Sequence, residues 1–110
     1  MRKFNHVGIP TTTPKEGEIY VEGMKLFLTD FNNSHNKIEF LRFESDSEMP
    51  EILKTHAHIA YEVPCLETAM EGKKLVLEPF QGGEGLMCAF IEEEGVAIEL
   101  MCFDKKQEAL

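Results

Sequence analysis

The chain has 110 residues, of which 43% are hydrophobic and 9% aromatic, and this composition supports one domain spanning 1–110. Because 20 acidic residues outnumber 11 basic ones and give a net charge of −9, nucleic acid and anionic membrane surfaces are poor partners. No apolar run approaches the ~20 residues of a membrane span, and the start of the chain lacks a signal-peptide core, so we expect a cytoplasmic protein.

The first half of the chain, a module at about 3–45, is predicted to contain strands and no convincing helix. Side chains alternate along its first strand, so Phe4, His6 and Gly8 should share one face. Turn-forming residues separate the strands. The expected elements are a strand at Phe4–Pro10, a turn at Thr11–Lys15, two strands or one bent strand within Glu18–Asp30 broken near Gly23, a loop at Asn32–Asn36 and a strand at Lys37–Glu44.

An acidic linker at about 46–56 leads into a second module at about 57–104. This module reads as a strand, a helix and three more strands, with Pro64 before the helix and Gly72 after it. The expected elements are a helical turn at Glu51–Lys54, a strand at His58–Val63, a helix at Leu66–Glu71, a strand at Leu75–Phe80, a flexible loop at Gln81–Gly85, a hairpin of Leu86–Glu92 and Val96–Phe103, and a polar, fraying tail from Asp104.

The two modules repeat one pattern of residues that can bind metals. His6-Val7-Gly8 is echoed by His58-Ile59-Ala60, and Ile38-Glu39-Phe40-Leu41 is echoed by Ile98-Glu99-Leu100-Met101. Fewer residues separate His6 from Glu39 than separate His58 from Glu99. The difference corresponds to about two helical turns, which matches the helix missing from the first module. Two histidines and two carboxylates in matched pairs are a set that a divalent metal ion could use.

Strand alternation allows these four side chains to face one cavity. In the second module the apolar faces opposite His58 and Glu99 should receive the helix, so both side chains would look into a concave surface. A lone histidine in a strand is more often structural, but a glutamate inside an apolar strand is costly to bury without a partner. The repetition therefore favours a shared metal or polar site. His56 has the same parity as His58 and is the chief rival ligand, whereas His35 should be solvated.

The cysteines and one glycine-rich segment do not indicate a functional site. Cys65, Cys88 and Cys102 are odd in number, widely spaced and set among apolar residues, which predicts reduced and mostly buried thiols. The Gly82-Gly83-Glu84-Gly85 segment lacks the lysine and the following helix of a phosphate-binding loop.

The repeated pattern of His6-Val-Gly-Ile, Ile-Glu39-Phe, His58-Ile-Ala and Ile-Glu99-Leu resembles the vicinal oxygen chelate superfamily, which includes glyoxalase I, methylmalonyl-CoA epimerase, extradiol dioxygenases and bleomycin-resistance proteins. The stretch from Leu77 to Phe103 also resembles the C-terminal module of glyoxalase I and the epimerase. The resemblance implies an α+β fold of two βαβββ-type modules that form a cupped, largely antiparallel sheet, with the usual helix missing from the first module. It also implies a divalent ion (Ni, Co, Zn or Fe) held by His6, Glu39, His58 and Glu99.

The same resemblance implies a metal-dependent glyoxalase-like lyase or an isomerase/epimerase. Such an enzyme would act on a small 2-oxo or thioester-type substrate through a metal-stabilised enediolate, with Glu99 or Glu39 as the base. Glutathione and coenzyme A adducts are less favoured, because Arg42 has the wrong parity and no other base lies obviously on the ligand face. Two alternatives stay open: a non-catalytic small-molecule-binding protein of the bleomycin-resistance type, and a structural dimer with vestigial ligands.

The missing helix also bears on partners. Without it, the outer-face residues Val7, Ile9, Ile38 and Phe40 should be exposed. Because an apolar patch of this kind is usually covered, we expect a homodimer or a rearranged N-terminal segment.

Overall fold

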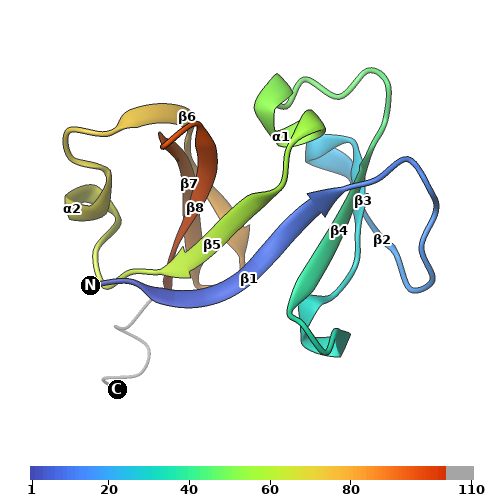
Figure 1. Ribbon diagram of the computed structural model, residues 1–110, viewed down its shortest axis with the longest axis horizontal. Coiled ribbons are helices and arrows are strands. Elements are labelled where there is room, and N and C mark those ends of the chain that lie inside the picture. Colours follow the sequence, from blue (N-terminus) through green and yellow to red (C-terminus); the bar gives the residue numbers. More distant parts are fainter. Residues whose placement is uncertain (104–110) are drawn as a thin grey trace.

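Eight strands form one curled sheet in this computed structural model, which describes residues 1–103 (Figure 1). The predicted α+β fold with a cupped sheet is confirmed. No helix within the described residues is long and apolar enough to cross a membrane. The elements are β1 (Lys3–Pro10), β2 (Ile19–Val21), β3 (Leu26–Leu28), β4 (Ile38–Phe43), α1 (Glu51–Thr55), β5 (His58–Glu62), α2 (Leu66–Met70), β6 (Lys74–Gly83), β7 (Leu86–Glu93) and β8 (Val96–Phe103), with 3₁₀ turns at Glu22–Met24 and Phe31–Asn33.

The strand order β2-β3-β4-β1-β5-β8-β7-β6 places the two modules side by side, with β1 and β5 at the centre. Only β1 with β4 and β5 with β8 are parallel, and the other neighbouring pairs are antiparallel. The pairing is symmetrical about the middle of the β1–β5 junction, so the modules are related by an approximate two-fold axis. The central pairs are His6–Ala60, Val7–Ile59 and Gly8–His58.

Helix α2 covers the outer face of the second module, as the apolar pattern predicts. Gly72 follows it with a φ of 72°, a left-handed conformation that commonly ends helices. The face of β5 and β8 that packs against α2 is the one opposite His58 and Glu99. The buried residues of this cluster are Val63, Ile91, Ile98 and Leu100, against which Leu66, Ala69 and Met70 of the helix pack.

The first module has an irregular connection, residues 11–18, where the second has its helix. The expectation that the outer-face residues are exposed is wrong, because Val7, Ile9, Ile38 and Phe40 are half-buried. The connection folds back over part of this face, and the Lys15 ammonium lies 4.4 Å from the ring centroid of Phe40. A rearranged segment therefore covers part of the surface that a helix would cover.

A β-bulge at Asn5 changes the facing of the first strand. The pairing of β1 with β5 shifts between Phe4 and His6, so that Phe4 pairs with Tyr61 and His6 with Ala60. The rings of Phe4 and Tyr61 meet edge to face on the outer side, with centroids 6.5 Å apart. The prediction that Phe4 shares the face of His6 is wrong, because one unpaired residue reverses the alternation.

Strand β6 extends further than predicted. Gln81, Gly82 and Gly83 continue the strand, so most of the expected loop at Gln81–Gly85 is sheet. The strand remains paired with β7 through several register shifts, and Gly82 allows a close approach because a Cβ there would lie 2.6 Å from Cys88 Sγ. The other predicted strands and the hairpin turn agree with the structure to within a few residues, and the tail from Asp104 lies outside the described residues.

The three thiols are free, as predicted, but their burial differs. Cys88 is buried and Cys102 is half-buried, whereas Cys65 is exposed. The apolar neighbours of Cys65 in the sequence belong to the turn before α2, which lies on the surface.

Candidate metal centre

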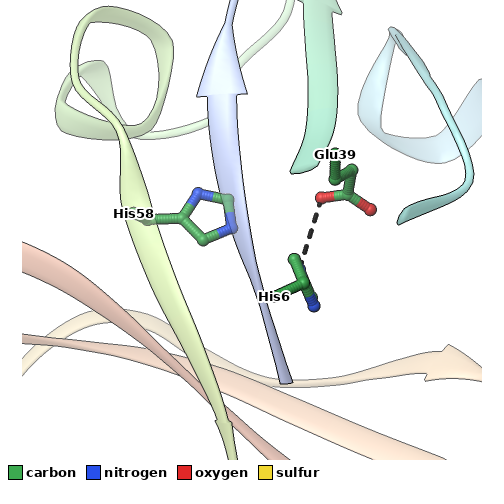
Figure 2. Close-up of side chains that lie close together, drawn as sticks. All are labelled: His6, Glu39 and His58. Carbon is green, nitrogen blue, oxygen red and sulfur yellow. Dashed lines mark ion pairs between the residues drawn. The ribbon is translucent and has the colours of Figure 1, made fainter. Parts of the chain in front are cut away.

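The structure brings all four predicted site residues together within one chain. His6 comes from β1, Glu39 from β4 and His58 from β5, and Figure 2 shows these three side chains pointing toward one another. Their ligand atoms all lie within 4.8 Å of one another. Glu99 of β8 completes the group, with Oε1 3.4 Å from His6 Nε2 and 3.2 Å from His58 Nε2.

The two-fold relation of the modules explains why these side chains converge. Glu39 pairs with Gly8 across β4 and β1, and Glu99 pairs with Ala60 across β8 and β5. Both glutamates therefore stand one strand away from the central junction, on the same face as the histidines. Both histidines are only 2% exposed, and the glutamate side chains are 14% and 12% exposed.

A glycine at position 8 makes room for the second histidine. A Cβ on Gly8 would lie 2.7 Å from His58 Nδ1 and closer still to Cε1 and Nε2. The imidazole of His58 therefore occupies the space that any other residue at position 8 would fill.

The ring of His6 is oriented by two neighbours. Asn5 Nδ2 donates a hydrogen bond of 2.8 Å to Glu62 Oε2, so Asn5 Oδ1 faces His6 and must accept from Nδ1, at 2.6 Å. This bond places the proton on Nδ1 and leaves Nε2 as the nitrogen that can bind a metal. The ring of Phe31 stacks on His6 at a centroid distance of 4.2 Å.

Three buried imidazole nitrogens make no well-aligned hydrogen bond, although carboxylate oxygens lie 3.2 to 3.6 Å from both Nε2 atoms. These buried atoms are His6 Nε2 and both ring nitrogens of His58, whose ring packs edge to face against Phe90 at 5.0 Å. An unpartnered polar atom in the interior is costly, so it calls for a functional explanation. The donor set, two imidazoles with carboxylates, suits Zn, Ni, Co or Fe. The buried group of His6, Glu39 and His58 could hold a metal ion.

The charges of the site favour a cation. Burial alone would lower the pKa of His6, but the carboxylates of Glu39 and Glu99 outweigh it and raise this pKa to about 9. Burial alone would raise the pKa of Glu99, whereas the two histidines lower it. At neutral pH the histidine is therefore held as an imidazolium between carboxylates, and a divalent ion would take the place of its proton.

A cavity of about 190 Å³ opens beside the four residues. Its polar lining consists of these residues with Gln81 and Cys88, and burial raises the pKa of the Cys88 thiol, so the thiol stays protonated. The rest of the wall is apolar: Val21, Met24, Leu26, Leu28, Phe31, Leu41, Phe43, Met49, Leu53, Phe80, Gly82, Leu86, Phe90 and Met101.

The remaining histidines lie outside this group. His56, the rival ligand, is exposed, and its Nδ1 lies 2.7 Å from Thr55 Oγ1. His35 is exposed in the loop, as expected. The sequence interpretation missed Asn5, Phe31 and Phe90 as residues that orient the histidines. Phe90 could have been found from the hairpin register, which pairs it with Glu99, but the bulge and the loop that place the other two left no periodic signal.

Comparisons with known proteins bear on the fold. No family model and no curated protein matches the chain. Among solved structures, a hypothetical protein of Bacillus halodurans C-125, BH1468, is 20% identical with a TM-score of 0.68, and the match covers 92% of this chain and 94% of that one. Methylmalonyl-CoA epimerase from Mycobacterium tuberculosis is also 20% identical, with a TM-score of 0.62 and coverage of 98% and 92%.

The chain has the same fold as these two proteins. At 20% identity the likeness establishes the fold alone. Within this fold the chain carries a His/Glu pair in each module, and the pairs meet at the two-fold axis.

Proposed function

We propose that the chain is a metal-dependent isomerase or epimerase, or a glyoxalase-like lyase, that moves a proton at a carbon next to a carbonyl group. The observation that carries this proposal is the meeting of two buried histidine Nε2 atoms with two glutamates at the wall of a mainly apolar cavity. The likeness to methylmalonyl-CoA epimerase supports an isomerase-like chemistry.

In this proposal His6, Glu39, His58 and Glu99 hold the ion. The bound ion would supply Lewis-acid stabilisation of the negative charge that develops on two neighbouring substrate oxygens as the proton leaves. The hydrogen bond from His6 to Asn5 and the stacking of Phe31 keep one imidazole in place. The mainly apolar wall would limit the water around the bound ion, which would strengthen the electrostatic interactions inside the site.

The two glutamates differ in how firmly they are held. Glu99 Oε1 lies within 3.4 Å of both histidine Nε2 atoms, whereas Glu39 Oε1 lies 3.6 Å from His6 Nε2 and the Glu39 carboxylate lies within 4.8 Å of the His58 ring nitrogen. Glu39 thus has the fewer close contacts, and, if partly released from the ion, it is our first candidate for the base that accepts the substrate proton. Glu99 is the second candidate, because the modules are related by symmetry and a base on each side of the substrate could exchange the proton from both faces.

The test combines metal content with proton exchange. Purified protein is loaded with Ni, Co, Zn or Fe in turn, its metal content is measured, and 2-oxo compounds, hydroxyketones and thioesters are incubated with it in D₂O and followed by NMR. We expect stoichiometric metal and deuterium incorporation at the carbon next to the carbonyl. His58→Ala should weaken metal binding by more than ~100-fold, since a direct ligand should matter at least as much as an outer partner. The matched control His56→Ala should bind like the parent.

Failure of the protein to retain any of these metals would refute the site. A second function, non-catalytic binding of a small molecule, is favoured by the mainly apolar wall of the cavity. In that case metal loading and ligand binding would occur without exchange at carbon.

A further inference from the structure

The linker between the modules forms a lid over the cup. In Figure 1 helix α1 lies between the two halves, on the side to which the curled sheet opens. Leu53 of this helix is 2% exposed and packs against Phe90 and Ala97 of the second module, and Phe43 of the first module packs against the same cluster. Met49 and Leu53 both line the cavity, so the linker forms part of its wall.

Polar contacts pin this lid to the turn after β2. Ser47 is buried, and its Oγ donates a 2.7 Å hydrogen bond to the backbone carbonyl of Met24. Lys54 Nζ donates to the backbone carbonyl of Ser47, and Lys25 Nζ forms a 2.7 Å ion pair with Asp46. With the lid in place the cavity measures about 190 Å³. This is below the ~300–1,000 Å³ of pockets that take drug-sized ligands.

The lining also selects by charge. The carboxylates of Glu39 and Glu99 are the acidic groups in the wall, and among residues 1–103 no lysine or arginine lines it. The nearby guanidinium of Arg42 is bound to Glu18 through two hydrogen bonds of 2.7 and 2.9 Å and lies over the ring of Phe27. The two positive charges of a divalent ion would be balanced by the two carboxylates, so that no net positive charge would remain to attract an anionic ligand. An anionic group in this cavity would therefore meet apolar walls and no countercharge.

We propose that the substrate is a small uncharged molecule that presents a hydroxyl and a keto oxygen on adjacent carbons and carries short apolar groups, as in an α-hydroxyketone. This inference rests on the proposed function for the two oxygens, while the size and charge limits come from the lid and the wall. A large anionic carrier such as a coenzyme A thioester would not be accommodated with the lid closed.

Two probes of equal size test the charge limit. Acetoin and lactate differ only in a methyl group in place of a carboxylate oxygen. Binding to the nickel-loaded protein is measured by calorimetry at neutral pH. We expect acetoin to bind at least tenfold more tightly than lactate. Equal or tighter binding of lactate, or no binding of acetoin at tens of millimolar, would overturn the inference.

A charge introduced into the wall provides a second test. Met24 lines the cavity and is half-buried, and lysine is close to methionine in length. The ratio of lactate to acetoin affinity should be at least tenfold higher for Met24→Lys than for Met24→Gln, which adds polarity without charge. An unchanged ratio between these two variants would contradict the argument from charge.

The size limit is tested with benzoin, the diphenyl counterpart of acetoin. Leu53→Ala removes part of the lid and should allow benzoin to bind, whereas the parent should exclude it. The control Leu100→Ala deletes the same atoms from a fully buried position that does not line the cavity, and it should also exclude benzoin. Met49→Ala, at a half-buried lid position, serves if Leu53→Ala does not fold. Binding of benzoin to the parent would refute the lid.

The two proposals fail in different ways. If acetoin binds selectively but its carbinol proton does not exchange with D₂O, the proposed catalysis is wrong and the ligand class stands. If lactate or a coenzyme A thioester exchanges its proton and binds as well as acetoin, the ligand class is wrong and the catalysis stands.

Discussion

The substitution Gly8→Ala tests the site by adding a single methyl group. The backbone at this residue is not in the left-handed region, so alanine can adopt its conformation. The new Cβ would collide with the His58 ring, since it would lie 2.7 Å from Nδ1 and closer to two other ring atoms. The ring cannot simply swing aside, because His58 is 2% exposed and packed against Phe90. The collision therefore displaces one of the four groups that we propose to bind the metal.

The magnitude follows from the two effects of this collision. Overpacking of a buried site costs roughly 1–3 kcal/mol of stability. Movement of a metal-binding imidazole should weaken metal binding by at least ~10- to 100-fold, the range seen when only an outer partner of a ligand is lost. The loss of metal affinity should thus exceed what the loss of stability would suggest.

The assay is competition with a chromophoric chelator, together with urea unfolding of the metal-free protein. Ala60→Gly is the matched control, because Ala60 is the two-fold equivalent of Gly8, is fully buried and faces His6. It should cost roughly 0.5–1 kcal/mol of stability through backbone freedom and should leave the histidines in place. If Gly8→Ala folds and binds metal within threefold of the parent, His58 is not a ligand in this geometry.

Three further predictions address the protonation and orientation of the site. Because the pKa of His6 is raised from 6.5 to about 9, its ion pairs stabilise the metal-free fold fully below about pH 6.5 and are lost as the pH rises through about 9. Metal binding at pH 7 should accordingly release one proton, and the metal affinity should rise about tenfold per pH unit toward pH 9. Calorimetry in buffers of different ionisation enthalpy measures the number of protons released. A metal affinity that does not change with pH would contradict this prediction. Asn5→Ala should weaken metal binding about 10- to 100-fold, because the His6 ring loses the hydrogen bond that orients it. The control Asn36→Ala, at an exposed loop position, should not weaken it. Equal metal affinities of the two variants would show that the hydrogen bond of Asn5 is unimportant. Glu99→Gln should weaken metal binding more than Glu39→Gln, because Glu99 approaches both histidines; the reverse order in the same competition assay would exchange their assignments.

Much of the fold could be predicted because the relevant forces are local. Alternation along the strands, the turn at Glu93–Gly95 and the stop at Gly72 determine which segments are extended and where α2 packs. The duplicated His and Glu pattern indicated which four side chains would lie together, since a repeated structural unit places equivalent side chains about one axis. Two expectations failed where a single residue or segment departed from the pattern, namely the bulge at Asn5 and the covering of Phe40 by the connection with Lys15.

The sequence by itself therefore determined the strands, the order of the modules and the pairing of His6 and His58 with Glu39 and Glu99. Only the tertiary structure decided how the site is enclosed. A bulge makes Asn5 a partner of His6, a 3₁₀ turn brings Phe31 onto the same ring, and the acidic linker folds into a lid through Leu53. These contacts join segments far apart in the chain, and none is encoded by a local period. The size and charge of the cavity depend on them, and so does the class of molecule that we propose it accepts.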